Sequence, residues 1–143
     1  MENYIVMSKV VVIGNGSGTI PNCNGKTVIC FNGFDTSVLT AYKKIIRIEN
    51  GHLLGESKTF KVAPLNQKMV KRLSTIAVKL EKQIYAWPSS GLTCLSTLKE
   101  LGCSFEYCKM QFHPSFIRSS GQDANIPLAA CFHNWLAEYR LAH

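Results

Sequence analysis

The stretch KVVVIGNGSGTIPNCNGKTVICFNG, Lys9 to Gly33, contains the features that decide the fold. Two short runs rich in β-branched residues, Lys9 to Ile13 and Thr27 to Phe31, have the composition of buried strands. An asparagine follows each run, Asn15 after the first and Asn32 after the second. Apolar strands that end in glycine and asparagine are typical of a parallel sheet, and such sheets bind ligands at their carboxyl edge.

The same rhythm continues along the chain, where short runs rich in Val and Ile alternate with longer amphipathic stretches. Further strands are predicted at Ile45 to Ile48, Thr59 to Val62, Ile84 to Trp87 and Phe105 to Met110. Helices are predicted after Asn66 as N-cap, from Ser90 to Leu101 with Gly102 as a left-handed cap, and over most of Leu128 to Leu141. This alternation predicts an α/β fold: a single-domain, Rossmann-like α/β/α sandwich over residues 1–143, with a mainly parallel sheet and helices on both faces.

Composition narrows the class of protein. The 143 residues are 46% hydrophobic and 17% charged, which suits one globular core. No run of about 20 apolar residues occurs and the first residues do not read as a signal peptide, so we expect no stable membrane insertion and a cytoplasmic location.

The six cysteines form no C-x-x-C pair, so we expect free thiols and no metal site. The formal charge of +7 indicates an anionic partner but does not choose among nucleic acid, a membrane surface and a phosphorylated small molecule.

The first glycine turn, GNGSG at 14–18, follows the first predicted strand directly. It is not a Walker-type phosphate loop, and its third glycine is wrongly spaced for the dinucleotide fingerprint. Glycine lets main-chain N–H groups approach a phosphate or sugar closely. Asparagine offers a donor and an acceptor, which suits a ribose hydroxyl, a pyrimidine edge or a phosphate. The alternative is that Asn15 and Asn32 only make turns.

A second turn of this kind begins WPSSGLTCLSTLKELG, Trp87 to Gly102. Here a predicted strand end is followed by a helix that starts with Ser89, Ser90 and Gly91, and helix N-termini bind anions through unpaired N–H groups. Two histidines flank the remaining candidate region: His113 in a long predicted loop, and His133, which is separated by four residues from Glu138. A single histidine is more often structural than catalytic, but two of them beyond the sheet favour a functional site.

Four short motifs therefore occur in order: VIGNG (12–16) with CFN (30–32), PSSG (88–91), HPSF (113–116) and HNWLAE (133–138). In this order they resemble the motifs of the eukaryotic-type sialyltransferases and their bacterial relatives. That family has a V-V-G-N turn with a strand ending in asparagine, a P-S-S/T-G helix start, a histidine-aromatic motif, and a histidine followed five residues later by a glutamate. The campylobacter-type sialyltransferases, with a G-N-G turn and an S-G helix start, are a second match.

The resemblance implies how each motif would act. Asn15 and Asn32 would contact the nucleotide of CMP-sialic acid, and the helix start would hold its phosphate or carboxylate. His133 would be the general base toward an acceptor hydroxyl, and His113 would interact with the phosphate leaving group. Glu138 would orient the terminal segment. The donor-binding residues would be Gly14, Asn15, Gly16, Asn32, Ser89, Ser90 and Gly91, with no metal and no cofactor besides the CMP-sugar donor substrate.

The leading hypothesis is a small sialyltransferase-like glycosyltransferase that takes a nucleotide sugar and a glycan acceptor. The alternative is a catalytically degenerate nucleotide-binding or regulatory module of the same fold, which the short chain favours. A nucleic-acid binder is disfavoured, because the chain lacks the interleaved aromatic and basic residues of an RNA-recognition strand and has no recognisable DNA-reading helix. The sequence leaves open the acceptor, the linkage, the donor sugar and whether the chain forms a homo-oligomer.

Overall fold

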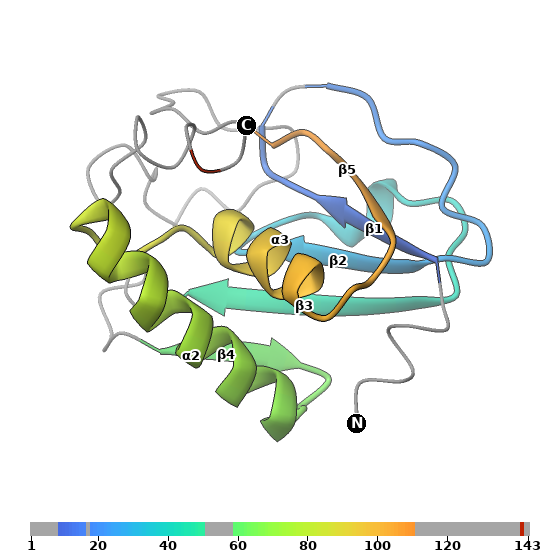
Figure 1. Cartoon of the computed structure of the whole chain (residues 1–143). Coiled ribbons are helices and arrows are strands. Elements are labelled where there is room, and N and C mark those ends of the chain that lie inside the picture. The colour runs from blue at the N-terminus through green and yellow to red at the C-terminus, as the bar shows by residue number, and fades with distance from the viewer. Residues whose placement is uncertain (1–8, 17, 51–58, 111–140, 142–143) are drawn as a thin grey trace.

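A computed structural model of the chain describes residues 9–16, 18–50, 59–110 and 141, and Figure 1 shows their arrangement. The described residues form one mixed sheet of five strands in the order β4-β3-β2-β1-β5. Strand β1 pairs in parallel with β2 and with β5, β2 pairs in parallel with β3, and β4 alone runs antiparallel to its neighbour. The strands are β1 (Val10–Ile13), β2 (Thr27–Phe31), β3 (Lys44–Asn50), β4 (Phe60–Ala63) and β5 (Phe105–Cys108). The prediction of an α/β fold with a mainly parallel sheet is confirmed.

Two α-helices are described, α2 (Gln67–Ile84) and α3 (Ser90–Glu100), together with a short 3-10 helix, η1 (Thr36–Val38). Both α-helices lie on one face of the sheet, where they share a single apolar core with β1 to β4 (Figure 1). The other face is covered, within the described residues, by the segments that follow β1 and β2, which contribute Cys23 and Phe34 to a second, smaller core. The predicted helix over Leu128 to Leu141 lies outside the described residues apart from Leu141 itself.

The helix ends follow their sequence signals. Asn66 caps α2, because its side-chain oxygen accepts a hydrogen bond of 3.0 Å from the N–H of Met69. Ser89 caps α3 in the same way, with 3.2 Å between its Oγ and the N of Leu92. Gly102 has φ +72°, the left-handed conformation predicted for it after α3. The predicted Asn66 cap and the predicted glycine stop are therefore confirmed, and of the two serines that could cap α3, Ser89 and Ser90, the cap is Ser89.

The predicted strand from Ile84 to Trp87 is wrong. Ile84 is the last residue of α2 and Tyr85 is its left-handed C-cap, with φ 59°. Ile84 lies one helical turn beyond Leu80 and continues the buried apolar face of α2. The run from Ile84 to Trp87 is too short for its hydrophobic pattern to distinguish a strand from the end of a helix. Trp87 turns back into the core, where its ring stacks on Phe60 at 5.7 Å between centroids.

The central strands of the sheet are buried because both faces of the sheet are covered there. All residues of β1 and β2 are buried, which explains their continuous runs of apolar residues. The core between the sheet and the helices contains a cavity of about 20 Å³ lined by Ile29, Ile48, Leu73, Leu98 and neighbouring side chains. A cavity of this size has room for about one water molecule, so it is no site for a small organic ligand.

Among the described residues, no helix is both long and apolar enough to cross a bilayer.

Candidate functional site at the carboxyl edge of the sheet

Asparagines connect the ends of three neighbouring parallel strands. Asn15, just after β1, donates from Nδ2 to the carbonyl oxygen of Asn32 at 2.7 Å. Asn32, just after β2, accepts with its Oδ1 from the N–H of Asn50 at 3.1 Å. Asn50 is the last residue of β3. The structure thus brings Asn15 and Asn32 together at the carboxyl edge, as their positions after parallel strands predict.

The segment before α3 is tied to the same edge through Asn50. Its Nδ2 donates to the carbonyl oxygen of Pro88 at 3.3 Å, and its Oδ1 accepts from Trp87 Nε1, also at 3.3 Å. Ser89 follows directly and caps α3. The three predicted elements, after β1, after β2 and at the start of α3, therefore lie at one end of the sheet together with the end of β3. Most of their side chains are buried, with exposed fractions of 3% for Asn32, 9% for Ser89 and 8% for Ser90, whereas Asn15 is half-buried.

The glycine turn after β1 is fixed by strand β5. Gly14 N–H donates to the carbonyl oxygen of Cys108 at 2.9 Å, and Gly16 N–H donates to that of Lys109 at 2.8 Å. A Cβ added to Gly14 would collide with the Lys109 carbonyl oxygen and lie 2.6 Å from Met110 Sδ. Glycine stands at position 14 because the end of β5 approaches so closely, and both N–H groups are already engaged by protein.

The N-terminus of α3 differs from the glycine turn, because some of its N–H groups have no acceptor among the described residues. Ser89 satisfies the N–H groups of Leu92 and Thr93, the latter through its carbonyl oxygen at 3.1 Å. No described residue accepts a hydrogen bond from the N–H of Ser90 or Gly91. A Cβ on Gly91 would lie 2.5 Å from the terminal methyl of Met110, so this methionine separates the two glycine-bearing elements. Among the described residues, the N–H groups without an acceptor at this edge belong to α3 and not to the glycine turn.

The two predicted asparagines each leave one polar atom without a partner. Asn15 Oδ1 and Asn32 Nδ2 are buried, and no described residue forms a hydrogen bond with either atom. A buried polar group left in this state costs about 1–3 kcal/mol. Each asparagine therefore uses one end of its amide to connect strand ends, and the other end is without a partner among the described residues. Together these atoms offer one acceptor and one donor.

Two cations beside the turn after β2 were not found from the sequence. Arg47, on β3, donates from Nη1 to the carbonyl oxygen of Phe31 at 3.3 Å and from Nη2 to that of Phe34 at 2.8 Å. Lys109 places its Nζ 5.8 Å from the centre of the Phe34 ring. Neither belongs to a local motif, because Arg47 lies on β3 and Lys109 directly follows β5. Asn50 was also missed, although it ends a strand in the same manner as Asn15 and Asn32.

The thiols near this edge are not activated. Burial raises the pKa of the Cys94 thiol to about 12, and burial is also the main cause of the raised pKa of Cys30 and of Cys108. A raised pKa keeps a thiol protonated at neutral pH and therefore weakly nucleophilic. The five described cysteines are all free, as expected; Cys131 lies outside the described residues. The described part of the chain holds no cluster of three or more metal-ligating side chains.

The predicted catalytic residues, His133 and His113, lie outside the described residues, as does Glu138. Comparison of the chain with protein-family models, with curated proteins and with solved structures finds no match.

Proposed function

We propose that the chain binds a nucleotide sugar of the CMP-sialic acid type at the carboxyl edge of its sheet and transfers the sugar to an acceptor hydroxyl. One observation carries the proposal: Asn15, Asn32 and the N-terminus of α3 converge on this edge through Asn50. Ligands of open parallel sheets bind at this edge. The sequence-based expectation of a Rossmann-like α/β/α arrangement and a cytoplasmic location belongs to the same proposal; the two described α-helices, α2 and α3, cover one face of the sheet.

The available atoms define what each part would hold. The N–H groups of Ser90 and Gly91, at the positive end of α3, suit a phosphate or carboxylate oxygen. Asn32 Nδ2 and Asn15 Oδ1 form a donor and acceptor pair that suits a pyrimidine edge or ribose hydroxyls. Gly14 and Gly16 would shape the turn, because β5 already occupies their N–H groups.

The proton transfer would come from residues outside this described edge. The polar groups at the junction itself are amides and hydroxyls, which do not accept a proton from an acceptor sugar at neutral pH. In the proposed reaction His133 takes the proton of the acceptor hydroxyl, and His113 stabilises the departing phosphate of CMP. Neutral imidazole suits the first role because its ordinary pKa lies near 6.5.

The same observation favours a second candidate, a nucleotide-binding module without transfer activity. The polar side chains at the described edge are amides and hydroxyls, which suit ligand binding better than proton transfer. The two candidates differ only in what the histidines do, so the donor site is common to both.

Titration calorimetry with CMP and CMP-sialic acid, compared with CDP, UDP, NAD and a DNA oligonucleotide, tests the shared donor site. We expect binding of the cytidine monophosphate ligands alone. Transfer or hydrolysis of CMP-sialic acid then separates the candidates: His133→Ala should lower the rate by about two to four powers of ten and still bind CMP. His113→Ala should weaken both. If the wild-type chain binds CMP but neither transfers nor hydrolyses the donor sugar, the transferase proposal is wrong and the binding-module candidate remains.

A further inference from the structure

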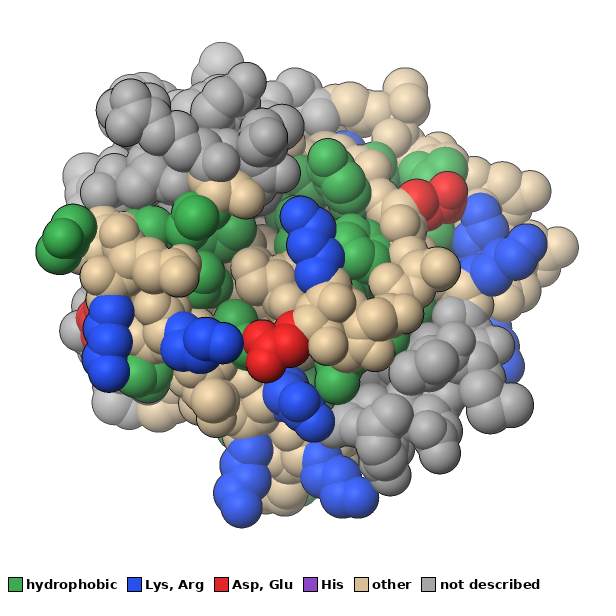
Figure 2. All heavy atoms as spheres, viewed as in Figure 1, with side chains coloured by type: hydrophobic (Ala, Val, Ile, Leu, Met, Phe, Trp, Pro, Cys, Tyr) green, Lys and Arg blue, Asp and Glu red, His purple; other side chains and the backbone are tan. Residues whose placement is uncertain are grey.

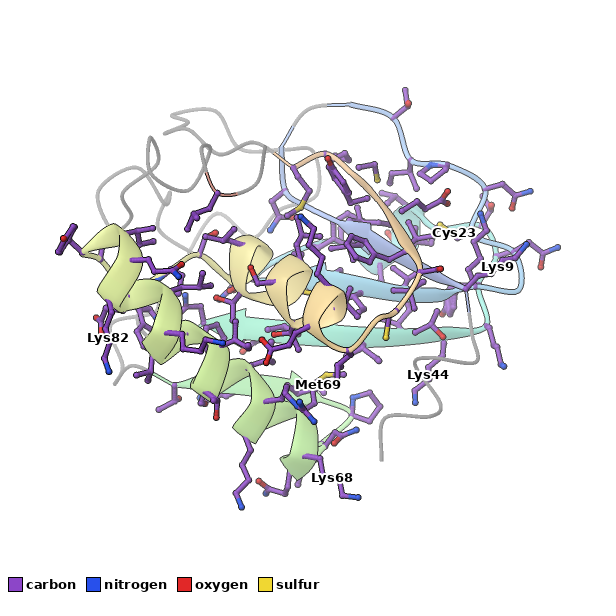
Figure 3. The ribbon with its side chains drawn as sticks, viewed as in Figure 1. Lys9, Cys23, Lys44, Lys68, Met69 and Lys82 are labelled. Carbon is purple, nitrogen blue, oxygen red and sulfur yellow. The ribbon has the colours of Figure 1, made fainter. Side chains whose placement is uncertain are left out.

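The outer face of α2 carries a stripe of five basic residues. The spacing of three, four and seven places the four lysines on the side of the helix away from the buried residues, whereas Arg72 is half-buried at the edge of that side and also lines the core cavity. Figure 2 shows Lys and Arg side chains gathered along this helix, and Figure 3 shows Lys68 and Lys82 near its two ends. We call this set the basic stripe: Lys68, Lys71, Arg72, Lys79 and Lys82.

Most of the charge on the basic stripe is not neutralised by the described residues. Lys68, Lys71 and Lys82 are exposed and form no ion pair within the described part of the chain. Lys79 pairs with Glu100 of α3 at 3.7 Å, but both side chains are half exposed or more, so the pair is weak. Glu81 is the single acidic residue of α2. The helix therefore presents a positive field over its whole length.

Apolar side chains lie within and beside the same stretch. Val78, one residue before Lys79, is 47% exposed; Leu65, just before the N-cap, is 74% exposed; and Tyr85, just after the last turn, is 91% exposed. Aromatic and aliphatic side chains beside a row of cations suit the boundary between lipid headgroups and acyl chains. A single-stranded nucleic acid would instead need several aromatic rings interleaved with the cations to stack successive bases; α2 itself contains none, and Tyr85 at its C-cap supplies a single ring.

We propose that the basic stripe is a docking surface for an anionic membrane, to which the chain binds peripherally. Four to eight Lys or Arg residues on one helix face suffice for attraction to acidic lipids. The apolar face of α2 stays in the protein core, so the contact is electrostatic and does not insert the helix. The inference rests on the charge of α2 and is independent of the proposed donor site.

Vesicle co-sedimentation of the full chain tests this. Wild type should bind vesicles of phosphatidylserine in phosphatidylcholine, bind phosphatidylcholine alone weakly, and dissociate as salt is raised. The triple variant Lys68→Gln/Lys71→Gln/Lys82→Gln should weaken binding about one hundredfold, since each lysine near an acidic surface contributes about fivefold. Gln has nearly the helix propensity of Lys, so α2 should persist, which far-UV circular dichroism checks.

The matched control removes the same charge from three lysines outside the basic stripe. Lys9, Lys43 and Lys44 are exposed, and Figure 3 shows Lys9 and Lys44 far from Lys82. Their triple change to Gln should weaken vesicle binding by less than about fivefold, because none of the three lies on α2. Equal losses in both triple variants, or no vesicle binding by wild type, would overturn the proposal. The proposal would also be overturned if the Lys68/Lys71/Lys82 variant lost binding to a DNA oligonucleotide but bound vesicles as well as wild type does.

Discussion

Gly14 and Gly91 stand on either side of Met110, yet they are glycines for different reasons. At Gly14 a side chain would collide with the backbone of β5, and the N–H group is already bonded to Cys108. At Gly91 a side chain would meet only the flexible end of Met110, and no described residue accepts from the N–H group. The sequence presents the two turns as equivalent ligand-binding elements. The structure separates them into one that builds the sheet and one that can face a ligand.

The largest expected effect is from Gly14→Ala. The new methyl group cannot be accommodated without moving the end of β5, so we expect a loss of about 3 kcal/mol in the free energy of unfolding. Urea denaturation monitored by circular dichroism measures this. Gly25→Ala is the control for alanine in a turn: nothing lies near its Cβ, and only the cost of φ +73° should appear. Equal, small losses in both variants would show that β5 does not constrain the first turn.

Asn50→Ala should be next in size. It removes the partners of Trp87 Nε1 and of the Pro88 carbonyl oxygen in a buried setting, so we expect a loss of about 2–3 kcal/mol. Asn24 is exposed, and Asn24→Ala should stay within about 0.5 kcal/mol of wild type. If Asn50→Ala proves as mild as this control, the connection between the sheet edge and α3 contributes nothing to stability.

Gly91→Ala should contrast with Gly14→Ala. Alanine gains about 1 kcal/mol in helix propensity, and the methyl end of Met110 can rotate away, so the net change should be within about 1 kcal/mol. Adding Met110→Ala should remove the remaining clash, which a double-mutant cycle reports. A loss as large as that of Gly14→Ala would contradict the distinction between the two glycines.

The smallest effect concerns Tyr85, where a tyrosine occupies a position that favours glycine. Its φ of 59° is left-handed, and its side chain is 91% exposed, so little burial is lost on its removal. We expect Tyr85→Gly to raise the free energy of unfolding by about 1 kcal/mol. Tyr85→Ala keeps the strained backbone and should not stabilise. Thermal unfolding of the two variants side by side distinguishes backbone strain from loss of the ring.

Much of this fold could be predicted because local signals decided it. Continuous apolar runs identified β1 and β2, Asn66 and Ser89 identified helix starts, and Gly102 identified a helix end. The prediction was wrong at Ile84 to Trp87 because a short apolar run fits a helix as well as a strand.

The site was predictable only in part. The positions of Asn15 and Asn32 follow from the rule that parallel strands share a carboxyl edge. The engagement of Gly14 and Gly16 by β5, and the placement of Arg47 beside the turn after β2, depend on pairing between segments far apart in the sequence. No local pattern encodes such pairings, so these roles became visible only in the folded chain.

The central claim is that the donor ligand contacts the N-terminus of α3 and the free ends of the asparagine amides, and not the N–H groups of the glycine turn. The most direct test is a titration of the ¹⁵N-labelled chain with CMP-sialic acid, followed by amide NMR. We predict large shifts for the N–H groups of Ser90 and Gly91 and for the side-chain amide of Asn32, with smaller shifts at Gly14 and Gly16. Unchanged spectra at saturating ligand, or shifts confined to Gly14 and Gly16, would contradict the account.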